Sequence, residues 1–150
     1  MSVASISLTA SRPVTYGMKR IIVIGSPGAG KSTFARALRD ALGLPLYYLD
    51  MIWHKSDKST VSREEFDEEL RRITESDEWI IDGNYGRTLD VRFAAADNVF
   101  LLDYPADVCL SGVEDRIGKA REDMPWVEEE FDPEFKAWIV SYRETQQCCY

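Results

Sequence analysis

Short apolar runs alternate with amphipathic stretches along most of this chain. We expect strands at four of the apolar runs, 21–24, 46–50, 79–82 and 98–103. We expect helices at the stretches with a helical period, about 31–42, 63–75, 105–117 and from Pro133 onward. The first run is fully apolar and β-branched, as in strands buried on both faces of a parallel sheet. Strands that alternate with helices predict an α/β fold with a parallel sheet.

The ends of the predicted helices carry the usual signals. Ser62 and Glu65 form the sequence pattern of a capping box before the second helix. Gly43 is expected to end the first helix. Residues 1–17 are rich in Ser and Thr and show no period, so we interpret them as a flexible N-terminal extension. The rest, 18–150, is predicted to be one domain.

Composition excludes several classes of protein. The chain has 150 residues with 18 Lys and Arg against 26 Asp and Glu, a net charge of −8 that argues against direct nucleic-acid binding. No apolar run approaches the roughly 20 residues of a membrane-spanning helix. Three cysteines and one histidine fit neither a disulfide framework nor a Cys/His metal site. We expect a cytoplasmic protein that is a monomer or a weak dimer.

The most specific motif follows the first predicted strand. It reads Gly25-Ser26-Pro27-Gly28-Ala29-Gly30-Lys31-Ser32 and is followed by Thr33. This is the Walker A pattern, whose glycines let backbone N–H groups surround phosphates at the start of a helix. Lys31 is expected to reach the β- and γ-phosphates, and the Ser32 hydroxyl to bind Mg²⁺. The motif predicts ATP and Mg²⁺ as cofactors, and the length and the absence of a guanine-reading N/T-K-x-D pattern favour a small-molecule or nucleotide kinase.

Two aspartates are placed at predicted strand ends. Asp82 ends the third strand, where a carboxylate can hold Mg²⁺ through water, although it can also cap a turn with Gly83. Asp50 ends the second strand, where it can orient or deprotonate an acceptor hydroxyl, although a turn-forming Asp looks the same in sequence.

Further candidates follow these strands. Arg87 and Arg92 can bind an anionic group of an acceptor, or they can be solvated helix residues. Trp53 and His54 can contact the acceptor, or they can pack in the interior.

Arg116 and Arg121 lie near a glycine in the segment that follows the fourth strand and its helix. They can fold over the transferring phosphoryl group, although cations also favour the end of a helix because of its dipole.

Four segments together resemble a known family. They are GSPGAGKST, YYLD with Trp53 and His54 after it, WIIDGNYGRTLDVR and RIGKAREDM. The chain from about Met18 to about Trp138 resembles the adenylate-kinase-related P-loop proteins, and within them those labelled DNA topology modulation proteins. The resemblance implies a three-layer P-loop NTPase fold like that of nucleoside monophosphate kinases. It also implies a parallel sheet in the order 2-3-1-4-5, an acceptor-binding insertion at 51–76 and a lid at about 117–131.

The same resemblance implies roles for single residues. Lys31 and Ser32 would handle ATP·Mg²⁺, Asp82 would be the acidic residue of the third strand, and Arg87 would contact the acceptor. Arg116 and Arg121 would be arginines of the lid. Relatives continue into a fifth strand and a loop that packs on adenine, and this sequence shows no such pattern, so we expect four to five strands.

These observations predict an ATP-dependent phosphotransferase that moves the γ-phosphoryl group to a small acceptor. The predicted catalytic residues are Lys31, Asp50, Asp82, Arg87, Arg116 and Arg121. The acceptor is predicted to meet Asp50, Trp53, His54, Arg87 and Arg92. The alternative is an ATP-binding regulatory protein with little or no transfer activity. The sequence contains no pattern that identifies the acceptor.

Overall fold

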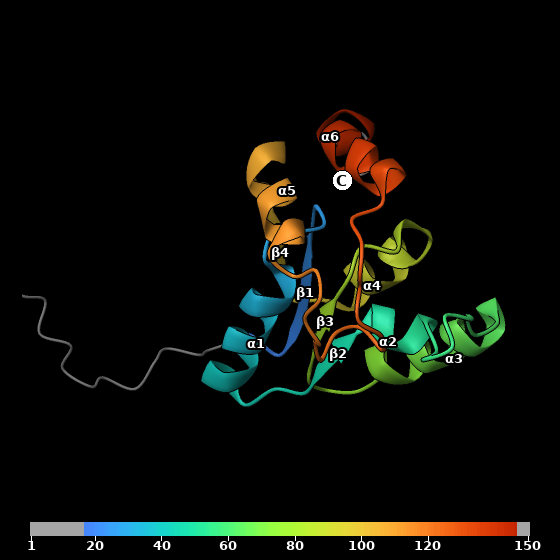
Figure 1. Cartoon of the computed structure of the whole chain (residues 1–150). Helices are drawn as coiled ribbons and strands as arrows, with labels where there is room; N and C mark the ends of the chain where they lie inside the picture. The colour runs from blue at the N-terminus through green and yellow to red at the C-terminus, as the bar shows by residue number, and fades with distance from the viewer. Residues whose placement is uncertain (1–16, 147–150) are drawn as a thin grey trace, which may run out of the picture.

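The computed structural model describes residues 17–146, so nearly all of the predicted extension at 1–17 lies outside the described residues. Four strands form one parallel sheet: β1 (Arg20–Gly25), β2 (Leu46–Tyr48), β3 (Trp79–Asp82) and β4 (Asn98–Leu102). Their order is β2-β3-β1-β4, which confirms the predicted order of the first four strands (Figure 1). Residues 17–146 contain no fifth strand.

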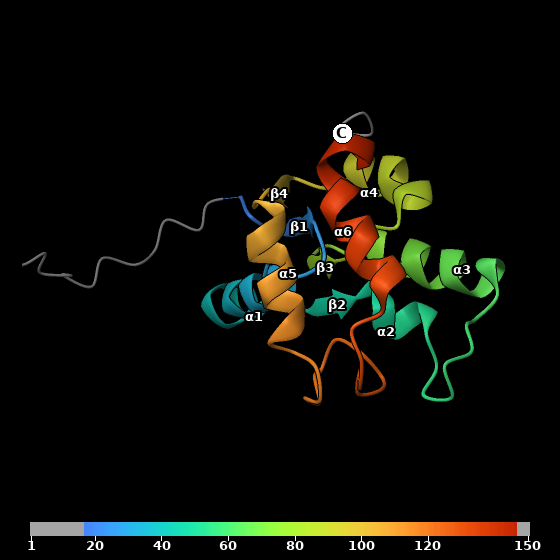
Figure 2. The ribbon, with the colours of Figure 1, turned by 45° about the horizontal axis from the view of Figure 1, so that its top comes forward.

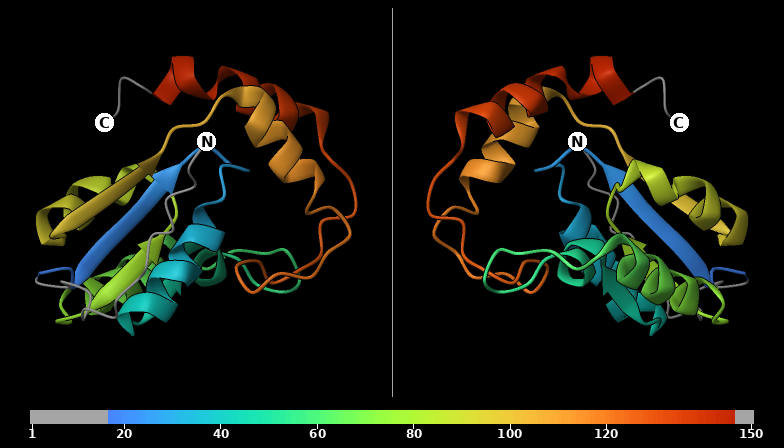
Figure 3. Two further views of the ribbon diagram at one scale, coloured as in Figure 1. Left: turned by 90° about the vertical axis from the view of Figure 1, so that its left-hand side faces the viewer. Right: turned by 90° about the vertical axis from the view of Figure 1, so that its right-hand side faces the viewer.

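Helices cover both faces of the sheet. They are α1 (Lys31–Leu42), α2 (Leu49–Trp53), α3 (Arg63–Thr74), the 3₁₀ turn η1 (Gly86–Thr88), α4 (Leu89–Ala95), α5 (Ala106–Glu114) and α6 (Pro133–Gln146). On one face Ile21, Val23 and Ile80 pack against α1. On the other face Ile22, Ile24 and Ile81 pack against α2, α3 and α4. This gives the predicted three-layer α/β architecture (Figure 3).

Local signals set two helix ends as predicted. The Ser62 hydroxyl accepts from the Glu65 backbone N–H, and the Glu65 carboxylate accepts from the Ser62 N–H, so the capping box of α3 is complete. Gly43 closes α1 in the left-handed conformation that favours glycine.

Two elements differ from the prediction. The strand predicted at 46–50 ends at Tyr48, and α2 begins at Leu49, so Asp50 lies in the first turn of a helix. The turn η1 and helix α4 were not predicted, because seven residues are too few for a helical period to stand out.

Helices α5 and α6 lie beside each other near the carboxyl ends of the strands (Figure 2). Cys109, Val113 and Ile139 join them in a third apolar cluster that includes Ala29 of the phosphate loop. The chain between α5 and α6, 115–132, contains the segment predicted to be the lid and has no regular secondary structure apart from turns. Within the described part of the chain no helix has the length and apolar character needed to cross a membrane.

Candidate active site

The phosphate loop leaves the carboxyl end of β1 and enters α1, as the Walker A pattern requires. Gly28 has a φ of +80°, and a Cβ placed there would overlap the backbone carbonyl of Cys109 in α5. Only glycine therefore fits between the loop and α5 at this position. Asn84, which follows β3, holds the start of the loop: its amide accepts from Gly25 N at 3.0 Å and donates to Gly25 O at 2.9 Å.

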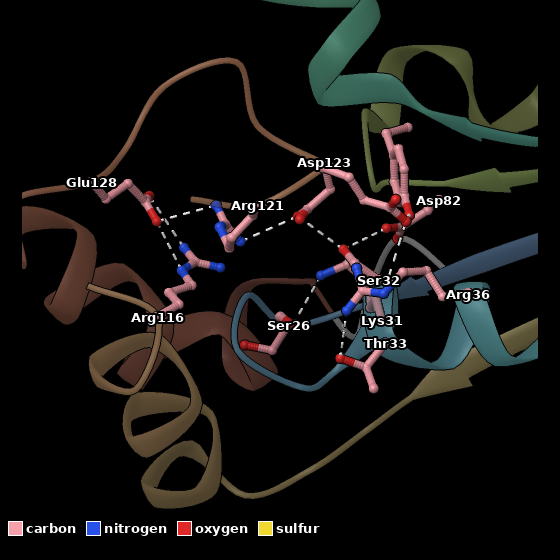
Figure 4. Close-up of polar contacts among 12 residues, drawn as sticks. Ser26, Lys31, Ser32, Thr33, Arg36, Asp82, Arg116, Arg121, Asp123 and Glu128 are labelled. Atoms are coloured by element: carbon pink, nitrogen blue, oxygen red, sulfur yellow. Dashed lines mark hydrogen bonds and ion pairs between the residues drawn. The ribbon is translucent and has the colours of Figure 1, made fainter. Parts of the chain in front are cut away.

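Lys31 extends from the first turn of α1 back over the phosphate loop. Its Nζ donates to the backbone carbonyl of Ser26 at 3.0 Å (Figure 4). Burial lowers the pKa of the Lys31 ammonium below its ordinary value, and the nearby carboxylates of Asp82 and Asp50 act in the opposite direction. Its position is that of a cation which neutralises phosphate charge inside the loop.

Ser32 lies between two carboxylates. Its Oγ is 2.7 Å from Asp82 Oδ2 and 3.0 Å from Asp123 Oδ2, so the lid segment touches the predicted magnesium ligand. Burial raises the pKa of Asp82 to about 6, although Lys31 and the Ser32 hydroxyl favour its charged form.

The residues here fit a magnesium ion. Asp82 Oδ1 is buried and has no hydrogen-bond partner among the described residues, as expected of an oxygen that would face Mg²⁺ or its water. No group of three or more acidic, His or Cys side chains within 17–146 is arranged to hold a metal by itself. That fits Mg²⁺, which keeps water and phosphate oxygens as most of its ligands.

The two predicted lid arginines face the phosphate loop. Arg116 Nε lies 2.9 Å from Glu128 Oε2, and Arg121 lies 3.2 Å from both Glu128 Oε2 and Asp123 Oδ2 (Figure 4). Arg116, Arg121 and Asp123 line one cavity of about 150 Å³ together with Lys31. Opposite this cluster, Thr33 Oγ1 accepts from Arg36 at 3.1 Å. The structure thus brings together the phosphate loop and the lid cations.

Asp50 points toward the same region from α2. The Tyr85 hydroxyl donates to Asp50 Oδ1 at 2.7 Å. Both residues line a larger cavity of about 520 Å³, which also includes Lys31 and Asp82. Burial and the Asp50 carboxylate raise the pKa of Tyr85, so this hydroxyl keeps its proton and remains a donor to Asp50.

The other predicted acceptor residues lie outside the larger cavity. Trp53 packs edge-on against Phe66, with ring centroids 5.5 Å apart. The His54 ring lies 5.0 Å from the ring of Trp126, a lid residue. Arg87 forms a two-point ion pair with Asp67, at 2.9 and 2.6 Å, on the exposed surface of α3.

Arg92 is placed differently from the prediction. It is fully buried, and its guanidinium donates to the backbone carbonyls of Gly83, Asn84 and Tyr85. An arginine that uses its donors on backbone carbonyls in the interior supports the loop after β3 rather than an acceptor group.

Two residues of the site were missed by the sequence reasoning. Asn84 stands in the GNYG segment, whose Asn directly after a glycine at a strand end was the available signal. Asp123 stands in the RED segment of the predicted lid, where only the arginines were singled out.

Comparison with known proteins agrees with this geometry at the level of the fold. Neither a protein-family model nor a curated protein sequence matches the chain. Shikimate kinase from Aquifex aeolicus vf5 superposes with a TM-score of 0.54 at 23% identity, over 87% of this chain and 83% of that one. The chain has the fold of a P-loop kinase. A sugar kinase from Janibacter sp. HTCC2649 also matches, with a TM-score of 0.47 at 19% identity, over 88% of this chain and 95% of that one. Membership of the DNA topology modulation proteins stays a prediction.

Proposed function

We propose that the protein is an ATP-dependent kinase that transfers the γ-phosphoryl group of ATP·Mg²⁺ to a small acceptor. The observation that carries the proposal is a single cavity of about 520 Å³ at which Lys31, Ser32 and Asp82 meet the cations of the predicted lid and Asp50. Phosphoryl transfer needs positioning and charge neutralisation more than covalent chemistry, and this arrangement supplies both.

Each group has a task in such a transfer. Backbone N–H groups of the loop and Lys31 bind the phosphates, while Ser32 and Asp82 would hold Mg²⁺, which when bound neutralises phosphate charge. Arg116 and Arg121 offset the charge on the transferring group from the lid side. Asp50 orients the acceptor hydroxyl and takes its proton as the oxygen bonds to the γ-phosphorus and the bond to ADP breaks.

ADP formation tests the proposal. Purified protein is incubated with ATP·Mg²⁺ and a panel of alcohols, amino alcohols, carboxylates and nucleoside monophosphates, alongside Lys31→Ala. We expect acceptor-stimulated ADP release that falls by about 100-fold or more in Lys31→Ala, because one charge-neutralising group in such a site contributes about 3 kcal/mol or more. Lys19→Ala, an exposed lysine at the start of β1, is the matched control and keeps the activity.

The contact between Asp123 and Ser32 favours the alternative function. Because a lid carboxylate touches the predicted magnesium ligand, nucleotide binding would change the position of the lid and the surface it presents. An ATP-binding regulatory protein would bind ATP·Mg²⁺ and capture a protein partner only with nucleotide present, while no acceptor raised ADP release above the Lys31→Ala background.

A further inference from the structure

The cavity of about 520 Å³ and the phosphate-loop cavity of about 150 Å³ share some of their lining residues, and the remaining residues of the two differ in charge. The two cavities share Lys31, Ser32, Arg116, Arg121 and Asp123. Every cation that lines the larger cavity is therefore also a cation of the phosphate-loop cavity. The lining residues that belong to the larger cavity alone, where an acceptor would sit, include no cationic side chain among those described, although the Arg116 guanidinium lies 5.7 Å from the ring centroid of one of them, Phe135.

Carboxylates line that part instead. They are Asp50, Glu128, Glu130 and Asp132, together with Asp82 at the boundary beside Ser32. Glu128 is neutralised by the two lid arginines. Glu130 is exposed at the cavity and forms no ion pair with any described residue, so its charge acts on whatever enters.

The arginines that an anionic acceptor would need are engaged elsewhere. Arg87 pairs with Asp67 and lines a separate cavity of about 270 Å³ beside α3, and Arg92 is buried against backbone carbonyls. A phosphate or carboxylate placed beside Asp50 and Glu130 would therefore meet repulsion, and the guanidinium groups of the same cavity, Arg116 and Arg121, are already paired with Glu128.

Aromatic groups complete the same part of the cavity. Phe135 and Trp138 of α6 stack with ring centroids 5.9 Å apart, and both line the cavity together with Tyr85. Aromatic faces bind the apolar C–H surface of a ring and also attract ammonium groups.

From this arrangement we propose that the acceptor carries neither phosphate nor carboxylate and is a neutral or amine-bearing alcohol. The inference rests on the proposed kinase function and narrows it, because it excludes nucleoside monophosphates and hydroxy acids. The acceptor hydroxyl lies at Asp50, and an amine, where present, lies toward Glu130.

Matched acceptors test the inference. ADP release is measured with glucose, glucosamine and glucose 1-phosphate, with ribose and ribose 1-phosphate, and with adenosine, adenosine 3′-monophosphate and AMP, so that each set has an anionic member that keeps the primary hydroxyl of the neutral one. We expect kcat/KM for the neutral or amine member to exceed that of its anionic partner by tenfold or more in each set that reacts. Glu130→Gln should lower kcat/KM for an amine-bearing acceptor about 3- to 10-fold and leave that of the neutral acceptor unchanged. Glu129→Gln, the next residue and not part of the cavity lining, is the control.

Failure of the inference can be distinguished from failure of the proposed function. If ADP release depends on Lys31 but AMP or another anionic acceptor is preferred, the proposed kinase function is supported. The inference that the acceptor is a neutral or amine-bearing alcohol is then wrong. The absence of acceptor-stimulated ADP release across the panel, at ATP concentrations that saturate binding, would overturn both. A charge reversal, Glu130→Arg, gives an independent measurement: it should raise kcat/KM for the anionic member of a set, and no change there would count against the inference.

Discussion

Arg87 and Arg92 are five positions apart in the sequence but lie in different environments, one exposed and one buried. Arg87 is exposed and paired with Asp67, whereas Arg92 is fully buried and donates to three backbone carbonyls. An exposed ion pair contributes little to stability because water screens it. A buried guanidinium that satisfies buried carbonyls contributes much more, because its loss leaves those oxygens without donors. The loop after β3, which carries Asn84 and Tyr85, depends on Arg92.

Substitution of the two arginines measures this difference. We expect Arg92→Ala to lower the free energy of unfolding by about 3 kcal/mol and Arg87→Ala to leave it nearly unchanged. Urea unfolding followed by circular dichroism gives both values. Equal losses in the two variants would contradict the structural role of Arg92.

The pH dependence of stability reports on Asp82. Its folded pKa of about 6 lies above the value of about 4 for an unfolded chain, so the folded protein binds the proton more tightly. The stabilisation from that proton is present below the unfolded pKa and is lost as the pH rises through the folded pKa. Without nucleotide or Mg²⁺, we therefore expect Asp82→Asn to be more stable than the unsubstituted protein above about pH 7.

Urea unfolding across the pH range checks this prediction. The advantage of Asp82→Asn should shrink as the pH falls toward about 4, because Asp82 then becomes neutral as well. Asp77→Asn, at an exposed aspartate, should show no such trend. If the difference in free energy of unfolding between Asp82→Asn and the unsubstituted protein stays constant with pH, the raised pKa of Asp82 is contradicted.

At the scale of single residues, the sequence predicted those site residues that belong to a local motif. Lys31 and Ser32 belong to one contiguous motif, and the structure places them in a loop between a strand and a helix, as the motif requires. Asp123 lies 91 positions from Ser32 and meets it only through the fold, so no local pattern could pair them. The burial of Arg92 was likewise invisible, because the same residue type in a short helix is more often solvated.

Among the elements, α5 and the phosphate loop approach each other so closely that no side chain fits between them at two glycines. A Cβ at Gly112 of α5 would overlap the backbone carbonyl of Gly28, and a Cβ at Gly28 would overlap that of Cys109. The two backbones are therefore in direct contact at Gly28 and Gly112, and α5 packs against the phosphate loop.

Replacement of Gly112 tests that contact. Alanine inside a helix is normally better than glycine by about 1 kcal/mol, yet we expect Gly112→Ala to lower the free energy of unfolding by about 2 kcal/mol and to weaken ATP binding at least tenfold. Gly86→Ala, at a glycine with open space around it and no left-handed φ, should be neutral. Thermal unfolding and calorimetric titration with ATP measure the two effects, and a stabilised Gly112→Ala would refute the close packing.

The long helices followed from the sequence because their periods and caps extend over many residues, whereas the order of the strands was implied by the resemblance to the adenylate-kinase-related proteins. The end of β2 did not follow from the sequence, since Leu49 and Asp50 continue an apolar-polar pattern that suits a strand as well as the first turn of α2. Only the packing of Leu49 in the core beside Phe66 and Ile81 decides between the two.

For the whole molecule, segment 115–132 links parts that are distant in the sequence. Asp123 reaches Ser32 of the phosphate loop, and Glu122 lies 3.1 Å from Arg39 of α1. Trp126 meets His54 beyond α2. These contacts place segment 115–132, the predicted lid, against the phosphate loop, α1 and the residue that follows α2.

The ion pairs of Glu128 with Arg116 and Arg121 connect both ends of segment 115–132, the predicted lid. Their loss should let the segment open more often, because Arg116 and Arg121 are both half-buried and share this one carboxylate. We expect trypsin to cleave Glu128→Gln within 115–132 roughly fivefold faster than the unsubstituted protein. The reason is that the substitution lowers the free energy difference between the closed and open segment by about 1 kcal/mol. Glu129→Gln should be cleaved at the original rate, and mass spectrometry locates the cuts. Equal rates in both variants would show that Glu128 does not hold the lid.

The edge-to-face contact between His54 and Trp126 has an optical consequence. An imidazole ring, above all in its protonated form, quenches the emission of an indole that it touches. Trp126 belongs to segment 115–132 and His54 follows α2, so the emission of Trp126 depends on whether these two parts meet. The chain thus carries its own fluorophore and quencher at this contact, and a separation of segment 115–132 from the end of α2 would change the emission of Trp126 without an added dye.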